Sequence, residues 1–104
     1  MIQAGFFESN GKLNGFSIKG HAGYAESGYD IVCASVSSVV QLTANTITEG
    51  FGVAAEVSVI GDNIMLELSQ PNRNAEVMLE MLKLHIEMLS EEFPKTIKIN
   101  TTEV

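Results

Sequence analysis

The chain has 104 residues, of which 45% are hydrophobic and 18% are charged, a composition typical of a globular protein with one hydrophobic core. Its formal net charge is −7, with only six lysine and arginine residues, so the basic face that nucleic-acid-binding proteins need is missing and direct RNA or DNA binding is not expected. An acidic surface is either a solubility device or a complement to a basic partner.

Two strands and a hairpin are predicted at the start of the chain. Residues 2–8 and 13–19 alternate between apolar and other side chains, which is the period of a strand. The Ser-Asn-Gly-Lys stretch at 9–12 predicts the turn between them, because Asn-Gly tolerates positive φ. A glycine-rich loop at 20–29 is expected to follow.

A first helix is predicted over residues 31–50, with Asp30 as its N-cap. This placement puts Cys33 in the first helical turn. The segment is uncharged until Glu49 and is apolar or small on most sides, which predicts that more than one of its faces is covered.

The second half of the chain repeats the pattern of a hairpin and a helix. Alternation predicts strands at 53–59 and 64–68 around a turn at 61–63, and Asn72 opens a predicted helix at 72–92. Its expected apolar side comprises Val77, Met78, Met81, Leu82, Met88 and Leu89. A last strand is expected at 96–100. The order β-β-α-β-β-α-β predicts an α+β domain, with a mostly antiparallel sheet packed against both helices.

The chain is expected to be one cytoplasmic domain, residues 1–104, without a membrane span. Residues 1–12 lack the features of a signal peptide. Residues 31–48, the longest uncharged stretch, contain eight Ser, Thr, Gln or Asn residues, which is too polar for a transmembrane helix. A single cysteine offers no internal disulfide. No ligand spacing supports a metal site, and no cofactor is expected.

Cys33 is the candidate nucleophile, and two interpretations of it are open. At a helix start, the dipole and unpaired N–H groups would favour the thiolate, and the N–H groups of Cys33 and Ala34 could stabilise an oxyanion. Alternatively, a lone cysteine among Ile31, Val32 and Ala34 is a small buried hydrophobe. His21 could act as its general base, or it could be an exposed loop residue without a role.

Asp30 and the loop glycines also allow both a structural and a functional interpretation. Asp30 is first of all a helix cap, and as a third catalytic member it could orient the imidazole. Gly20, Gly23 and Gly28 would let the loop close on an extended peptide. They match no phosphate-binding motif, since the loop has no lysine.

Other catalytic arrangements are less favoured by the sequence. A cysteine phosphatase needs an arginine near its thiol, and the single arginine, Arg73, opens the second helix. His85 falls among apolar residues of that helix and is expected to be a packing residue rather than the partner of Cys33.

The stretch GHAGYAESGYDIVCASVSSVVQLTANTI, residues 20–47, closely resembles the signature of the ribosomal-processing cysteine proteases called Prp. The resemblance implies an endopeptidase that removes a short N-terminal extension from ribosomal protein number twenty-seven of the large subunit. It implies Cys33 as nucleophile, His21 as base, Asp30 in a supporting position, and a homodimer. The candidate substrate-binding positions lie near Cys33 and His21 in the sequence. They are Gly20, Gly23, Gly28, Ala34, Ser35 and Ser38.

Two alternatives from other classes are a non-catalytic ribosome-assembly module with a structural cysteine, and a thiol switch that cycles through sulfenic acid or a mixed disulfide.

Overall fold

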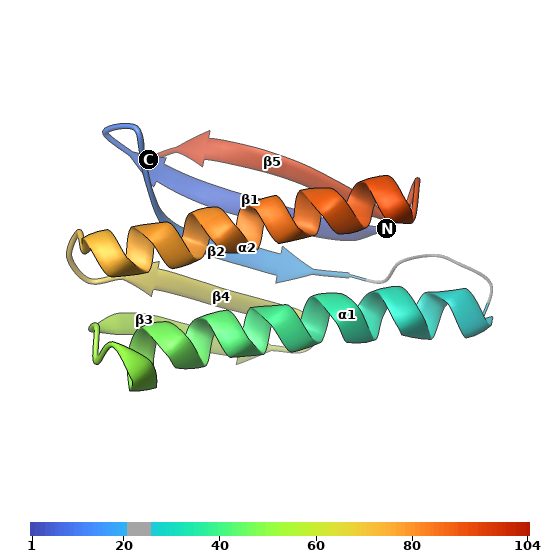
Figure 1. The fold of residues 1–104 in the computed structure, drawn as a ribbon, viewed down its shortest axis with the longest axis horizontal. Coiled ribbons are helices and arrows are strands. Elements are labelled where there is room, and N and C mark those ends of the chain that lie inside the picture. Colours follow the sequence, from blue (N-terminus) through green and yellow to red (C-terminus); the bar gives the residue numbers. More distant parts are fainter. Residues whose placement is uncertain (21–25) are drawn as a thin grey trace.

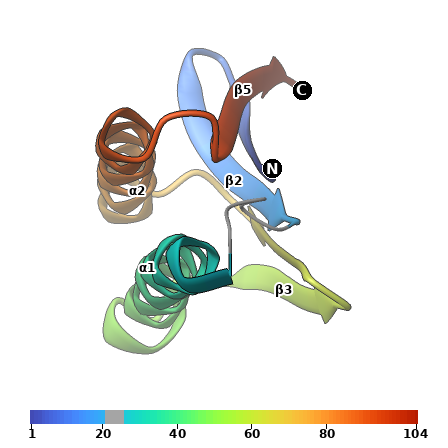
Figure 2. The same ribbon diagram turned by 90° about the vertical axis from the view of Figure 1, so that its right-hand side faces the viewer.

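Residues 1–20 and 26–104, which the computed structural model describes, form a five-stranded sheet with two long helices on one face (Figure 1; Figure 2). Within residues 26–30 only the backbone is described. In chain order the elements are β1 (Ile2–Ser9), β2 (Lys12–Lys19), α1 (Glu26–Asn45), the π-helical turn η1 (Thr46–Gly50), β3 (Ala55–Ile60), β4 (Asn63–Leu68), α2 (Arg73–Glu92) and β5 (Ile97–Glu103). The predicted order of strands and helices, and the α+β class, are confirmed.

The sheet is mixed, with the strand order β3-β4-β2-β1-β5. The pairs β1–β2, β2–β4 and β3–β4 are antiparallel, whereas β1 and β5 are parallel. Since β1–β2 and β3–β4 are hairpins, α2 must carry the chain from β4 back along the sheet to β5 at the opposite edge (Figure 1). The prediction of a mostly antiparallel sheet is therefore confirmed, with one parallel pair that the strand periodicity did not show.

The turn between β1 and β2 has the geometry that its sequence predicts. Asn10 and Gly11 both have positive φ, 55° and 76°. Two consecutive positive φ values match the right-handed twist of the flanking strands, which is why Asn-Gly is favoured there. The Asn-Gly dipeptide therefore fixes this hairpin locally.

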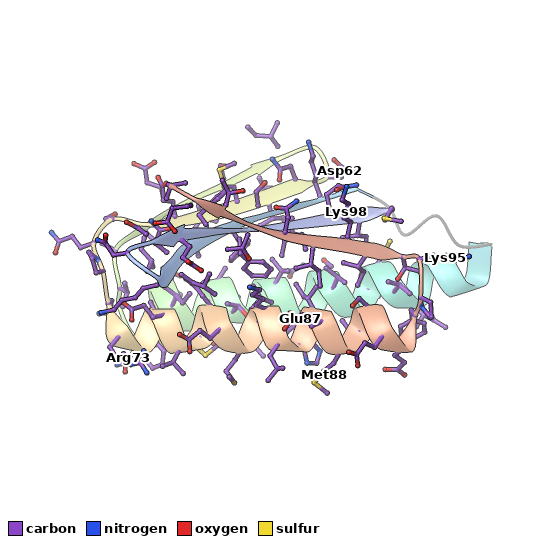
Figure 3. All side chains as sticks on the ribbon, turned by 90° about the horizontal axis from the view of Figure 1, so that it is seen from above. Asp62, Arg73, Glu87, Met88, Lys95 and Lys98 are labelled. Atoms are coloured by element: carbon purple, nitrogen blue, oxygen red, sulfur yellow. The ribbon has the colours of Figure 1, made fainter. Side chains whose placement is uncertain are left out.

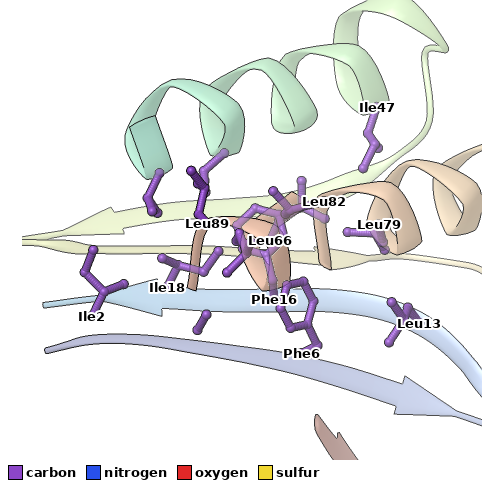
Figure 4. Close-up of a cluster of buried hydrophobic side chains, with 14 of the residues drawn as sticks. Ile2, Phe6, Leu13, Phe16, Ile18, Ile47, Leu66, Leu79, Leu82 and Leu89 are labelled. Atoms are coloured by element: carbon purple, nitrogen blue, oxygen red, sulfur yellow. The ribbon is translucent and has the colours of Figure 1, made fainter. Parts of the chain in front are cut away.

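The core lies between the sheet and the helices (Figure 4). Phe6 and Phe16 are opposite each other on β1 and β2, and Leu66 of β4 is opposite Phe16 on its other side. All three side chains are fully buried, as are Leu79 and Leu82 of α2. Each such side chain contributes about 1.5–3 kcal/mol of transfer free energy, so this face of the sheet carries the packing that positions the rest.

The buried side of α2 matches the predicted apolar side only in part. Its buried residues include Leu79 and Ile86, whereas Val77, Met81 and Met88, predicted for the apolar side, are 38%, 49% and 57% exposed. Leu82 and Leu89, also predicted for the apolar side, are buried as expected. Apolar residues surround much of this helix, so periodicity alone gave only part of the buried face. The predicted packing role of His85 is also wrong, because its side chain is exposed.

The segment Ile31–Gly50, which runs through α1 into η1, is long and apolar enough to cross a membrane by length and composition. This differs from the sequence expectation that it is too polar. The core helix of a soluble protein passes the same test, and here Val32, Val36 and Val40 are buried in the core shared with the sheet. The absence of a membrane span therefore stays a prediction.

Candidate active site

A cavity of about 310 Å³ lies beside Cys33, between α1 and the adjoining ends of β1 and β2. Ile2, Ile18 and Val36 line it and are themselves buried, so its floor is apolar. Gly20, the residue directly after β2, lines the same cavity. The half-buried thiol of Cys33 is therefore next to a space that an apolar side chain of a bound peptide would fit.

The helix that carries Cys33 begins earlier than predicted. It starts at Glu26, so Asp30 lies inside it and the prediction of Asp30 as N-cap is wrong. Cys33 therefore lies beyond the first turn, where backbone N–H groups bond to carbonyls four residues earlier. The arguments from a helix-start thiolate and from free N–H groups at Cys33 and Ala34 do not hold in this structure. A good N-cap residue does not by itself mark a helix start, because Asp inside a helix costs at most about 0.7 kcal/mol relative to Ala.

Gly20 has a conformation that only glycine adopts readily. Its φ is +98°, and a Cβ there would lie 2.9 Å from the carbonyl oxygen of Met1, closer than real Cβ contacts allow. Glycine at this position therefore lets the end of β2 pass against the first residue of the chain. The backbone conformation at Gly20 thus requires glycine for a reason other than the predicted closing of the loop on a peptide.

The remaining predicted site residues fall into two groups. His21 and Gly23 lie outside the described residues, and so does the side chain of Asp30. The structure therefore gives no distance from Cys33 to the side chain of His21 or Asp30. Gly28 belongs to the backbone of α1.

Ala34, Ser35 and Ser38 are described, and none of them lines the cavity. Ala34 and Ser38 are exposed, and the Ser35 hydroxyl donates to the Ile31 carbonyl at 2.8 Å. The structure therefore does not bring these three candidates to the space beside Cys33.

Three polar residues that the sequence did not single out line the cavity: Ser37, Lys19 and Asp62. Ser37 follows Cys33 by four positions, so helical spacing could have identified it. Asp62 comes from the turn between β3 and β4 (Figure 3), which no local pattern connects to α1. In the described part of the chain, no three His, Cys, Asp or Glu side chains gather as metal ligands would.

Comparison with known proteins identifies the family. The model of the family described as cysteine protease Prp matches residues 1–98 of this chain. The chain belongs to the cysteine protease Prp family. The resemblance seen in residues 20–47, and the prediction of a cysteine protease, are thereby confirmed.

Relatives of known function span nearly the whole chain. The ribosomal processing cysteine protease Prp of Bacillus subtilis is 27% identical over 97% of both chains. The protein of the same name from Staphylococcus aureus is 28% identical, covering 86% of this chain and 88% of its own. The Prp match is therefore not confined to the signature around Cys33.

Solved structures share the fold. A Prp crystal structure from S. aureus in complex with a substrate peptide has a TM-score of 0.88 at 23% identity, covering 98% of this chain and 100% of that one. A Streptococcus mutans protein has a TM-score of 0.81 at 27% identity, covering 100% of this chain and 96% of that one. The fold of the S. aureus Prp structure therefore extends over nearly the whole of this chain.

Proposed function

We propose that this chain removes the N-terminal extension of a large-subunit ribosomal protein, number twenty-seven of that subunit, during ribosome assembly. Its family consists of cysteine proteases, and relatives are named as ribosomal processing enzymes. The observation that carries the proposal for this chain is that Cys33 and Gly20 line one cavity. His21 is the residue that follows Gly20 in the sequence.

In the proposed mechanism, His21 takes the thiol proton of Cys33 and the thiolate attacks the carbonyl carbon of the scissile peptide bond. The C–N bond breaks as His21 returns the proton to the leaving amine, which leaves a thioester on Cys33. Water then attacks the thioester with His21 again as base, releasing the new carboxyl terminus and restoring the thiol. Asp30 precedes Cys33 by three positions in α1, a spacing that shares a helix face, and is proposed to orient His21.

The described surroundings support a peptide substrate. The apolar floor made by Ile2, Ile18 and Val36 suits an apolar side chain next to the scissile bond. The net charge of −7 would favour encounter with a basic ribosomal protein through long-range attraction.

The test is incubation of the chain with the precursor protein, followed by intact-mass measurement. Wild type is expected to remove the extension, whereas Cys33→Ser and His21→Ala are expected to leave it uncut. Ser58→Ala, on exposed β3, is the control that keeps cleavage. Circular dichroism on each variant establishes that the fold is retained.

A folded wild-type chain that leaves the precursor intact would overturn the proposal. If Cys33→Ser is inactive as a protease but supports ribosome assembly in cells as well as wild type does, the chain acts there as a non-catalytic assembly module instead.

The chain is further proposed to act in the cytoplasm as a homodimer, without binding nucleic acid or membrane. The support is its family and its acidic composition. Analytical ultracentrifugation is expected to give twice the chain mass, and a single-chain mass at all concentrations would contradict the dimer.

A further inference from the structure

A second cavity, of about 290 Å³, lies where the β1–β2 turn, the end of β4 and the start of α2 meet. These three segments gather at one end of the sheet, while α1 begins at the other end (Figure 1). Leu13, Leu68 and Pro71 give the cavity apolar walls, and Asn14, Glu76 and Lys12 give it polar ones. Neither the proposed mechanism nor the relatives' names involve this place.

Glu76 brings a buried carboxylate to this cavity. Its side chain is only 5% exposed, and its Oε2 atom accepts no hydrogen bond from the described residues. Among the described residues the nearest cation is Arg73, whose Nη1 lies 3.6 Å from Oε2 and whose side chain is 74% exposed. This separation is longer than a hydrogen bond, so Arg73 neutralises part of the charge without satisfying the oxygen.

Asn14, which lines the same cavity, carries a second acceptor and lies at a β-bulge of β2. Phe7 pairs with Gly15 and Glu8 pairs with Leu13, which leaves Asn14 without a partner on β1. A bulge redirects side chains relative to the regular alternation of a strand. The Oδ1 atom of Asn14 is buried and, in the part of the chain that the structure describes, accepts no hydrogen bond.

Two residues that line one cavity thus each carry a buried acceptor that no described residue satisfies. These acceptors call for a ligand that donates hydrogen bonds and tolerates a carboxylate. A primary ammonium group fits, because it carries three donors and a single positive charge. An anion is disfavoured by Glu76. A calcium ion needs six to eight oxygen ligands, of which these two residues would supply few.

Two positively charged side chains near this cavity restrict how many ammonium groups a favourable ligand carries. Lys12 and Arg73 are both exposed. Lys12 lines the same cavity as Glu76, and Arg73 lies 3.6 Å from the Glu76 carboxylate. Like charges repel at this range, so a ligand with several ammonium groups has no advantage over one with a single group.

We propose that this cavity binds a single primary ammonium group, held by Glu76 Oε2 and Asn14 Oδ1. The group is either that of a small free amine or that of a lysine side chain in a partner polypeptide. This site is independent of the proposed proteolysis.

The experiment titrates the ¹⁵N-labelled full chain with n-butylammonium chloride and follows its amide spectrum. We expect saturable shifts of the Asn14 side-chain amide and of the Ala75 backbone amide, with a midpoint on the order of 1–10 mM for so small a ligand. Tetramethylammonium chloride, which has the charge but no N–H donor, is expected to cause no saturable shift.

Variants test the two acceptors and the neighbouring cation. Glu76→Gln and Asn14→Leu are expected to weaken binding at least about tenfold, whereas Asn14→Asp keeps it because an acceptor remains. Glu80→Gln makes the same charge change on the exposed side of α2 and is expected to leave affinity unchanged. Arg73→Gln is expected to tighten binding, since it removes the cation that competes for Glu76. If Glu76→Gln fails to fold, the two Asn14 variants carry the test.

A final arm distinguishes the sources of the ammonium group. A Gly-Lys-Gly peptide with blocked ends is compared with n-butylammonium, and tighter binding of the peptide assigns the site to a lysine of a polypeptide, while equal or weaker binding assigns it to a free amine. The absence of a saturable shift, an equal response to tetramethylammonium, or unchanged affinity in both Glu76→Gln and Asn14→Leu would overturn the proposal.

Discussion

Replacing Gly20 by alanine tests how the end of β2 is held against the cavity beside Cys33. Gly20 has a φ of +98°, and the new Cβ would lie 2.9 Å from the Met1 carbonyl oxygen. Positive φ costs a residue other than glycine about 1–2 kcal/mol, and forcing atoms into a filled space costs about 1–3 kcal/mol more. We therefore expect Gly20→Ala to lower the free energy of unfolding by roughly 2–5 kcal/mol.

Gly11→Ala is the matched control for this change. Gly11 also has positive φ, +76°, but a Cβ there would meet nothing within 4 Å, so only the backbone cost of about 1–2 kcal/mol applies. Urea denaturation followed by circular dichroism measures both variants, and the precursor-cleavage assay measures activity. Cleavage is expected to fall in Gly20→Ala, because the cavity wall must move, and to be unchanged in Gly11→Ala. Equal losses of stability in the two variants would refute the reasoning from the Met1 contact.

Two further predictions concern α2. The Leu82 side chain is only 1% exposed, so Leu82→Ala is expected to lower the free energy of unfolding by about 2–5 kcal/mol. The Met88 side chain is 57% exposed, so Met88→Ala is expected to lower it by less than about 0.5 kcal/mol. Similar losses of the two variants in urea denaturation would mean that the helix packs through another face. Asn72→Ala removes the acceptor for the Ala75 N–H, at 3.0 Å, and is expected to cost about 1 kcal/mol. Thermal unfolding measures this loss, and an unchanged Tm would show that the cap bond adds nothing.

Elements whose cause is local could be predicted from the sequence. The Asn10-Gly11 turn has its expected positive φ values, and Asn72 caps α2 as its residue type suggests. The alternation over residues 2–8 and 13–19 predicted the two strands that the structure forms there, β1 and β2. These features depend on backbone preferences and on the two-residue period of a strand, and both can be read from a few neighbouring residues.

The predictions that failed needed information from distant residues. The start of α1 was placed after Asp30, yet the helix begins at Glu26, since a good cap residue does not by itself prevent a helix from extending further back. The buried face of α2 was predicted only in part: Leu82 is buried, but Met81 and Met88 are exposed although they are as apolar as the residues that do pack. Contact with the sheet, and not apolar character, decides which side of that helix is covered.

The sequence by itself determined the order of the elements, the hairpin turn at Asn10 and, through residues 20–47, the resemblance to the Prp family. The tertiary structure alone decided that Asp62 lines the same cavity as Cys33, and that Asn14 and Glu76 line another. Sequence patterns report interactions over a few residues, whereas a cavity is enclosed by segments that the sheet order brings together from distant parts of the chain. The side chains that share a cavity are therefore set by the packing of the whole fold.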